Sequence, residues 1–347
     1  MLGYARGAVF AAAAAALFAA GSAQAQTQLK AVGTWGNLSN WQHIEKPFWE
    51  KDLPEASGGS LTGDAKPLTE LGLRGFEVMR LLKLGVFDVA HALPIYVAED
   101  AVIEGIDLAG VATDFKTARA VADAYRDVLA DALSKNYSAK LLNVYPFPAQ
   151  VFYCRTPISG IADLKGKKVR VQGASQGDFV EAVGGAPVTI AFAEVVPAMQ
   201  KGVVDCGITG TMPGYKAKWY EVASHVFTLP VGFTITFTAI NENSWNKLDE
   251  KQQEALLKAS AAFEDKGWEV IEAENEEGIA CGTGTGECTV GAPGKMTLVK
   301  PGEADVKARE TALNEGVLRK WAQRCGADCV KQWNETVGKV VDLQAGG

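Results

Sequence analysis

The 347-residue sequence has only three histidines and no paired C-x-x-C motifs. Structural zinc sites use these ligands at these spacings, so a zinc site is disfavoured. Beyond residue 25 no apolar run reaches about 18 residues, so no membrane-spanning helix is expected there. Basic residues are also in the minority, with 34 Lys and Arg against 41 Asp and Glu. This balance disfavours nucleic acid and anionic membrane surfaces as principal partners.

Nucleotide-binding motifs are missing as well, although the chain contains 37 glycines. The stretch GTGTG at residues 282–286 has the wrong spacing for a dinucleotide fingerprint, and no βαβ pattern follows it. Residues 160–167 miss the P-loop pattern because five residues separate the glycines and no Ser or Thr follows the lysine. We therefore expect no cofactor.

The N-terminus has the pattern of a secretory signal peptide, which we assign to residues 1–25. Arg6 precedes an alanine-rich apolar run over residues 7–20, and an Ala-Gln-Ala ending at Ala25 resembles a cleavage site. The run is too short, and its flanks are wrong, for a membrane span. We expect cleavage after Ala25 and export of the remainder, which would be more acidic by one charge. A permanent N-terminal anchor is the alternative.

All six cysteines lie in the part of the chain that we expect to be exported. An even number of cysteines in an oxidising compartment indicates disulfide bonds. Six cysteines permit 15 pairings, and the sequence alone does not choose among them. We favour Cys281–Cys288 and Cys325–Cys329, because each pair closes a short local loop. Cys154 and Cys206 then remain as the third pair.

Strand and helix patterns alternate along the chain, which is typical of α/β proteins. Strands are predicted at residues 29–34, 60–68, 85–92, 140–145, 149–154, 168–171, 188–191, 202–207 and 227–240. Helices are predicted at residues 75–84, 114–133, 194–201, 214–223 and 247–278. A further helix is predicted after the glycine-rich bend that begins at Gly173. Another is predicted after Ser39, a candidate N-cap, and Pro47 is expected to bend it. Residues 279–294 are predicted to be a disulfide-pinned loop, and residues 342–347 a frayed end.

Two features of this pattern indicate two lobes with a cleft between them. The extended segments around 145–154 and 227–240 are suited to cross between lobes, and a helix of about 30 residues would span about 45 Å. We predict lobe 1 from residues 26–147 and 237–275 and lobe 2 from residues 148–236 and 276–330, followed by a C-terminal segment, 331–347. Such clefts suit ligands that must be enclosed.

An enzymatic alternative comes from residues 173–177, GASQG, which match the G-x-S-x-G nucleophile elbow between a strand and a helix. Asp205 and His225 follow Ser175 in the order Ser, Asp, His that α/β-hydrolases use. However, only 50 residues separate Ser175 from His225, and no His-Gly-Gly oxyanion segment is present. The glycines also serve a simpler end, because they let backbone amides approach a carboxylate near a helix N-terminus. A secreted serine hydrolase is thus the rival interpretation.

Four segments in order resemble the solute-binding component of tripartite ATP-independent periplasmic (TRAP) transporters. They are GLRGFEVMRLLKLGVFDVAHALP, PISGIADLKGKKVRV, PVTIAFAEVVPAMQKGVVD and KWYEVASH. Each segment alone is weakly specific, but four with the family's spacing are strongly so, and the resemblance covers nearly the whole mature chain. It implies a type II-like periplasmic binding protein fold, with the long helix spanning both lobes. A sensor ligand-binding module is a second non-enzymatic possibility.

The resemblance implies that Arg170, at the Lys-x-Arg-Val position, binds the carboxylate of an organic acid. A guanidinium is planar and permanently charged, and it matches a carboxylate in bidentate geometry. A strand holds it rigidly, so little entropy is lost on binding. On its own, an arginine in a strand is more often a solvent-facing or ion-paired side chain.

Further pocket residues follow from aligned positions. Phe192 falls where the family uses a pocket phenylalanine, and Thr209 takes the place of an asparagine. Gln150 stands where some members carry a second arginine, and Leu93 stands where sugar-acid-binding members have a polar residue. These departures disfavour polyhydroxylated sugar acids. The full set of candidate ligand-binding residues is Arg170, Gln150, Trp35, Leu93, Gln172, Phe192, Thr209, Gly210 and Met212.

We therefore predict a monomeric periplasmic protein that captures an organic acid anion and performs no chemistry on it. Trp35, Leu93, Phe192 and Met212 together indicate an apolar or aromatic body behind the carboxylate. The resemblance implies delivery of the ligand to the integral membrane subunits of a permease that is driven by an ion gradient.

Overall fold

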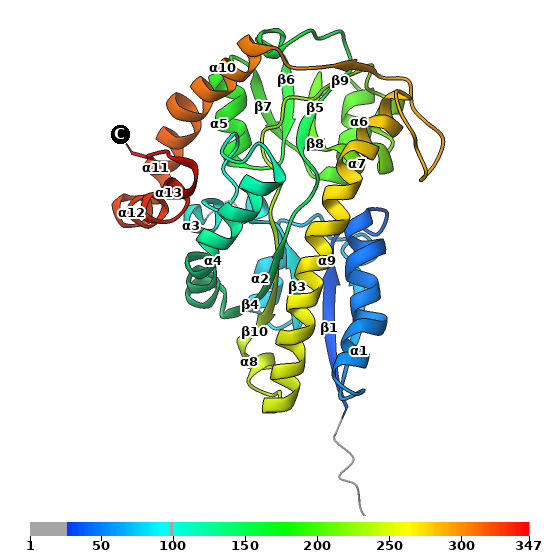
Figure 1. Ribbon diagram of the computed structural model, residues 1–347, viewed down its shortest axis with the longest axis vertical. Coiled ribbons are helices and arrows are strands. Elements are labelled where there is room, and N and C mark those ends of the chain that lie inside the picture. Colours follow the sequence, from blue (N-terminus) through cyan, green and yellow to red (C-terminus); the bar gives the residue numbers. More distant parts are fainter. Residues whose placement is uncertain (1–25, 98–99, 347) are drawn as a thin grey trace, which may run out of the picture.

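The computed structural model describes residues 26–97 and 100–346, so the predicted signal peptide lies outside the described residues. Two mixed β-sheets, each flanked by helices, lie one above the other, and α9 (Glu250–Thr283) runs along both (Figure 1). The α/β prediction with two lobes is confirmed. In the described part of the chain no helix combines the length and apolar character that a bilayer crossing requires.

The first sheet has the strand order β2-β1-β3-β10-β4. Its strands are β1 Thr27–Gly33, β2 Leu61–Pro67, β3 Val89–Ala92, β4 Ala139–Tyr145 and β10 Thr236–Asn241. β1 pairs in parallel with β2 and β3, whereas β10 is antiparallel to both of its neighbours. The last strand of the sheet in chain order thus returns from the second sheet and inserts between β3 and β4.

The second sheet has the strand order β11-β9-β5-β8-β6-β7. Its strands are β5 Gln150–Cys154, β6 Lys168–Val171, β7 Ala186–Thr189, β8 Cys206–Gly210, β9 His225–Phe227 and β11 Thr297–Val299. β6 lies between β7 and β8 and is parallel to both. Arg170 therefore projects from an interior strand, where the backbone is held on both sides.

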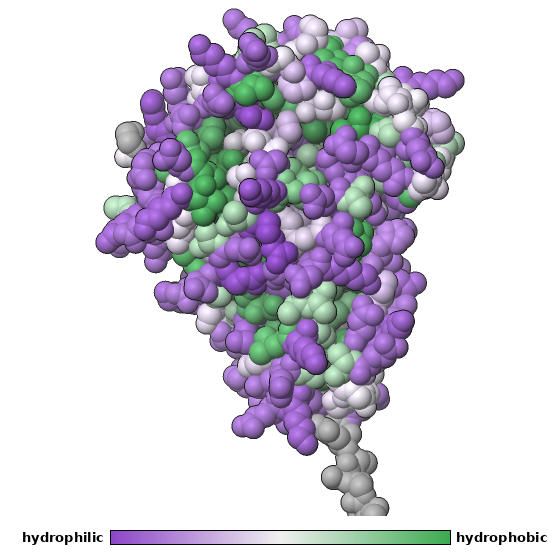
Figure 2. All heavy atoms as spheres, viewed as in Figure 1, coloured by the Kyte–Doolittle hydropathy of each residue, from purple (hydrophilic) through white to green (hydrophobic). Residues whose placement is uncertain are grey.

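Helices cover the sheets and connect them. Their bounds are α1 Leu53–Ala56, α2 Val78–Lys83, α3 Ala101–Glu104, α4 Phe115–Tyr137, α5 Ala174–Ala182, α6 Val195–Gln200, α7 Thr211–Lys216, α8 Glu242–Trp245, α10 Glu303–Thr311, α11 Arg319–Cys325, α12 Ala327–Glu335 and α13 Val337–Val341. Hydrophilic residues cover most of the face shown in Figure 2, with smaller hydrophobic groups between them. We call the part of the molecule that contains the first sheet the first half and the part that contains the second sheet the second half. α9 packs against α1 and β4 of the first half and against α7 of the second, as expected for a helix of its predicted length.

The predicted strand at 227–240 is wrong, because it is two short strands in different sheets. β9 ends at Phe227, residues 228–235 cross between the sheets without strand structure, and β10 begins at Thr236. Gly232 and Thr234 both have positive φ, which is incompatible with an extended strand. The alternation in the sequence continues through the crossing because apolar side chains there are buried as well.

Other predicted boundaries also shift. Ser39 provides no side-chain cap, and the helical segment from residue 40 to Ala56 passes through Pro47 with π-helical turns on either side. The strands predicted at 188–191 and 202–207 are β7 and β8, displaced along the chain. The helix predicted at 214–223 is α7, which starts earlier and stops before Lys218, where φ is 59°.

The largest omission is the helical C-terminal region from α10 to α13. The helix α13 packs on α4, α11 packs on α3, and the π-helical segment Ala312–Leu318 packs on α5. The end is not frayed as predicted: Leu343 donates to the Gly338 carbonyl, and buried Ala345 exchanges hydrogen bonds with Asn334. The C-terminal helices thus join elements of both halves, on one side of the molecule (Figure 1).

The three favoured disulfides are present. Cys154–Cys206 joins directly paired residues of β5 and β8, and Cys325–Cys329 joins α11 to α12. Cys281–Cys288 pins a loop, but that loop begins later than predicted, because α9 continues through Cys281. The helix ends at Gly284, whose φ of 72° suits a left-handed C-cap.

Trp333 of α12 is fully buried and donates its indole N–H to the Gly105 carbonyl at 2.9 Å. We expect Trp333→Ala to lower the free energy of unfolding by about 3–5 kcal/mol, because a large buried side chain and a hydrogen bond are lost together. Val340→Ala, at a position that is 42% exposed in α13, should change it by less than about 0.5 kcal/mol. Urea unfolding measures both. Equal effects would show that the C-terminal helices do not contribute to the core.

Candidate ligand-binding site

A small cavity lies between the two sheets, with about 20 Å³ open to the centre of a water-sized sphere. Residues of both halves line it, and most of them are apolar or aromatic. They are Trp35, Leu38, Leu93, Tyr96, Phe147, Gln150, Gln172, Phe192, Thr209, Gly210, Pro213 and Thr234. None of these side chains carries a charge, so the charge available to the cavity comes from behind its wall.

Arg170 supplies that charge from β6. Its side chain is fully buried, and its Nε and Nη1 donate to the carbonyls of Ile190 and Ile208 at 2.9 and 2.7 Å. Nη2 is buried without a hydrogen-bond partner of good geometry among the described residues, although the Tyr96 side chain lies close enough to interact with the guanidinium. Among the described residues, Arg170 forms no ion pair with a carboxylate. Burial lowers the pKa of Arg170, while its interaction with Tyr96 opposes this. A buried cation with an unused donor is suited to bind an anion.

Aromatic rings hold the guanidinium in place. Its Cζ lies 6.0 Å from the ring centre of Phe192 and 5.8 Å from that of Trp219, and these two rings stack. Across the cleft, Trp35 meets Phe192 edge to face at 5.3 Å. Trp35 and Phe192 also line an outer hollow of about 300 Å³, so these two rings lie between the cavity and this hollow.

Two amides give the cavity a fixed polar edge. Gln150 donates its Nε2 to the Pro148 carbonyl at 2.9 Å and accepts the Nε2 of Gln172 at 2.7 Å. Because a carbonyl can only accept, the Pro148 contact determines which way the Gln150 amide points. It thereby also determines the orientation of the Gln172 amide, whose backbone N–H is bound by Gln176.

The structure brings most of the predicted site residues together. Those that line the cavity are Trp35, Leu93, Gln150, Gln172, Phe192, Thr209 and Gly210. Arg170 lies directly behind Phe192, whereas Met212 lies apart and packs with Tyr215 and Cys281. Their roles in binding remain predictions.

Sequence reasoning missed five residues that line the cavity: Leu38, Tyr96, Phe147, Pro213 and Thr234. Tyr96 follows β3 closely, so its position after a strand end was an available signal. Phe147 lies in the first crossing segment, residues 146–149 between β4 and β5, and Thr234 lies in the second, residues 228–235 between β9 and β10. The sequence did not show where these two crossing segments bend.

The structure contradicts the hydrolase alternative. Ser175 is fully buried; its Oγ accepts from the Ala109 backbone at 2.6 Å and its N–H donates to Glu104. Asp205 binds the backbone N–H of Lys168, at the start of β6, whereas Ser175 follows the end of that strand. His225 starts β9, and its Nδ1 contacts Ser224. The three side chains therefore do not form a triad.

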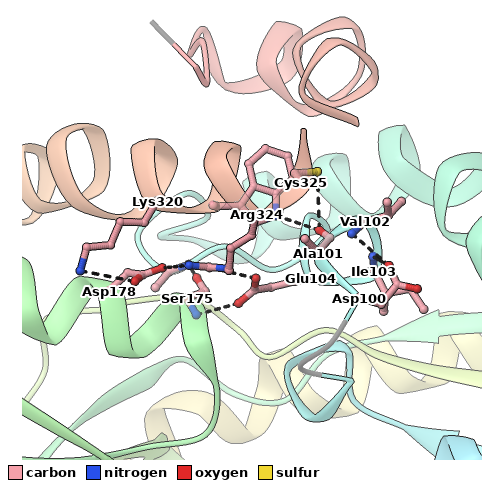
Figure 3. Close-up of polar contacts among 12 residues, drawn as sticks. Asp100, Ala101, Val102, Ile103, Glu104, Ser175, Asp178, Lys320, Arg324 and Cys325 are labelled. Atoms are coloured by element: carbon pink, nitrogen blue, oxygen red, sulfur yellow. Dashed lines mark hydrogen bonds and ion pairs between the residues drawn. The ribbon is translucent and has the colours of Figure 1, made fainter. Parts of the chain in front are cut away.

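Ser175 instead belongs to a charged cluster that joins three helices (Figure 3). Arg324 of α11 binds Glu104 of α3 at 3.1 Å and Asp178 of α5 at 2.7 Å, and Lys320 adds a further ion pair to Asp178. Burial raises the pKa of Glu104, and the charge of Arg324 opposes that effect. Through α11, this cluster connects α3 of the first half to α5 of the second.

Gly173 explains the first glycine of the G-x-S-x-G match. A Cβ at this position would lie 2.4 Å from the carbonyl oxygen of Ile95, which follows β3 of the first sheet. Only glycine permits this approach of the two backbones. The neighbouring residues Gln172 and Tyr96 both line the cavity, so the close contact fixes part of its wall.

A buried network supports Trp35 from the first half. Glu45 accepts hydrogen bonds from the backbone and hydroxyl of Thr34, both at 2.7 Å, and from Tyr145 at 2.9 Å. Tyr145 also contacts His91, whose Nε2 accepts from Trp49. Burial lowers the pKa of His91 to about 3, so His91 is a neutral core residue.

Residues 32–286 match the model of bacterial extracellular solute-binding protein, family 7. The sialic acid-binding periplasmic protein SiaP of Vibrio cholerae is 24% identical over 268 residues, which is 75% of this chain and 82% of that protein.

Solved structures show the same fold. DctP7 of Bordetella pertussis, an extracytoplasmic solute receptor binding pyroglutamic acid, has a TM-score of 0.79 at 22% identity, covering 90% of this chain and 99% of that one. A TRAP periplasmic solute binding protein from Desulfovibrio salexigens with bound orotic acid has a TM-score of 0.80 at 18% identity, with 90% and 99% coverage.

Glu45 should make the stability of the protein pH-dependent. Burial raises its pKa from 4.5 to about 7, so the folded state binds the proton more tightly than the unfolded state. Its contribution is therefore fully present below pH 4.5 and is lost as the pH rises through 7, by roughly 3 kcal/mol. Glu45→Gln removes the charge, and its free energy of unfolding should fall less than that of the wild type over this range.

Urea unfolding between pH 4.5 and 7.5 measures this difference. Glu50→Gln, which removes an exposed carboxylate from the same helical segment, controls for the change in net charge. Parallel curves for wild type and Glu45→Gln would contradict the assignment.

Proposed function

Because the chain belongs to the bacterial extracellular solute-binding protein family 7, we propose that it captures a small organic acid in the periplasm and delivers it to a TRAP-type permease. The protein acts as a monomer and performs no chemistry on its ligand. The predicted signal peptide accounts for its export. The integral membrane subunits of the permease are its macromolecular partners.

The observation that carries this proposal is the buried guanidinium of Arg170. An uncompensated buried charge is strongly unfavourable, and here the residue is retained with Nη2 unpaired. A ligand carboxylate supplies the missing charge and accepts the free N–H donors. In a site shielded from water, this pair is screened less than it would be at the surface.

The rest of the cavity indicates which acids fit. Among its described lining residues there is no basic side chain, so a second carboxylate would be buried without a partner. The polar lining side chains, those of Tyr96, Gln150, Gln172, Thr209 and Thr234, are uncharged, and the walls formed by Trp35, Leu93, Phe147 and Phe192 are apolar. We therefore propose a small monocarboxylate with a compact body and few hydroxyl groups. Dicarboxylates and polyhydroxylated acids would leave polar groups unpaired.

A panel of acids tests the proposal by thermal denaturation and calorimetry. Pyroglutamate and orotate represent compact monocarboxylates, succinate represents dicarboxylates, and sialic acid represents polyhydroxylated acids. A compact monocarboxylate should stabilise the wild type, by about 2.7 kcal/mol at 100 times its Kd, while succinate and sialic acid should have smaller effects. No stabilisation by any of the four would contradict the proposed function.

Arg170→Ala should weaken binding of the stabilising acid by at least about 2 kcal/mol, because the carboxylate would lose its only cation. Lys168→Met removes an exposed charge from the same strand and should leave the affinity unchanged. Unchanged affinity of Arg170→Ala would remove Arg170 from the site.

Gly173→Ala should also weaken binding, because its methyl group would displace the Ile95 carbonyl and with it the adjacent cavity wall. We expect a loss of about tenfold or more, equivalent to roughly 1.4 kcal/mol. Gly177→Ala is the matched control: its Cβ meets Pro187 at an ordinary 3.7 Å. Calorimetry with the same acid compares the two, and equal affinities would show that the Gly173 contact does not shape the site.

A further inference from the structure

Thr234 lies where the second crossing segment enters the first sheet, between β9 and β10, and it lines the cavity. Its carbonyl accepts from the backbone N–H of Phe147, which belongs to the other crossing segment. The two segments are joined again by Gln150, whose N–H donates to Gly232 and whose carbonyl accepts from Val231. Thr234 is thus held at the point where both connections between the halves meet the cavity.

The backbone of Thr234 is strained. Its φ of 41° lies on the left-handed side, which β-branched residues rarely adopt because the side chain crowds the backbone. Such conformations are maintained only where the surrounding structure imposes them, and they are concentrated at functional sites. Glycine or asparagine would relieve this strain, so the threonine side chain is retained against a conformational cost.

The hydroxyl of Thr234 is also unusual. The residue is 2% exposed, and Oγ1 is buried without a hydrogen-bond partner among the described residues. A buried hydroxyl without a partner is unfavourable by comparison with a methyl group of the same shape. Within the part of the chain that the structure describes, Arg170 Nη2 and Trp219 Nε1 share this property, as do side-chain atoms of Ser39, Asn143, Ser260 and Glu274, which do not line the cavity.

We propose that the Thr234 hydroxyl is a specificity-determining contact, which hydrogen-bonds a polar group on the body of the ligand. This inference rests on the proposed function of the same cavity. Arg170 binds the carboxylate, and Thr234 hydrogen-bonds a carbonyl, N–H or hydroxyl elsewhere on the ligand, in the cavity that the oriented amide of Gln172 also lines. The ligand class is therefore narrower than an apolar acid: a compact monocarboxylate with one polar edge, such as a lactam or a planar heterocycle.

The test compares Thr234→Val and Thr234→Ser with the wild type by calorimetry. Pyroglutamate and orotate are the polar probes, and cyclopentanecarboxylate has the ring of pyroglutamate without its amide. For whichever polar probe binds the wild type, Thr234→Val should weaken binding about tenfold, whereas Thr234→Ser should stay within about threefold. Thr234→Val should bind cyclopentanecarboxylate at least as well as the wild type does.

Thermal denaturation without ligand provides an independent readout. Valine keeps the shape and the β-branch, so Thr234→Val should fold, and its Tm should equal or exceed that of the wild type because an unpaired hydroxyl is removed. A markedly lower Tm would mean that the hydroxyl is bonded within the protein, and this would overturn the proposal.

Affinity for the polar probes that is unchanged in Thr234→Val would overturn it as well, while leaving the role of Arg170 intact. If neither polar probe nor any acid of the earlier panel bound the wild type, the proposed function itself would be contradicted, and this inference with it.

Discussion

The structure depends on one constraint: a guanidinium is buried in an interior strand without a carboxylate to balance it. The carbonyls of Ile190 and Ile208 and the rings of Phe192 and Trp219 position the charge but do not neutralise it. Because an uncompensated buried charge opposes folding, the surrounding core must be stable enough to tolerate it. The same cost makes binding of an anion favourable, so the instability of the empty site becomes affinity for the ligand.

This constraint explains why the described residues that line the cavity include no other charged side chain. A compact aromatic wall excludes water, which strengthens the interaction between Arg170 and a carboxylate. Every further buried donor or acceptor must then find a partner in the protein or in the ligand. Gln150 and Gln172 find theirs in a chain that ends at the Pro148 carbonyl, whereas Thr234 does not. Among the groups that line the cavity, this difference separates the amides that hold the wall from the hydroxyl that we propose binds the ligand.

Much of this could be predicted from the sequence, because repeated strand and helix patterns and short cysteine loops are local signals. Arg170 and Phe192 were found through the resemblance to a known family, at aligned positions, because an arginine in a strand is by itself more often solvent-facing or ion-paired. Thr234 and Phe147 were not, because alternation of apolar residues looks the same in a strand and in a buried crossing. The C-terminal helices were missed because they become a unit only through packing on α3, α4 and α5. The G-x-S-x-G match at Ser175 suggested a hydrolase wrongly, because the motif is a local sequence pattern, whereas a catalytic triad depends on the tertiary structure.

The positions of the charged contacts also indicate how the cavity can open. Glu104 and Asp178 lie on different halves, are nearly fully buried, and are both bound by Arg324. Arg324 is itself about a third exposed, so water screens these pairs in part, but one guanidinium binds both carboxylates at once. At the outer hollow, by contrast, the halves meet through the Trp35–Phe192 contact and the exposed Arg74–Glu194 ion pair, which contributes little. We therefore expect the Arg324 cluster to stay closed and to act as a pivot. In an open form the halves would then separate at Trp35 and Phe192, and the cavity would be uncovered on the side where those two rings meet.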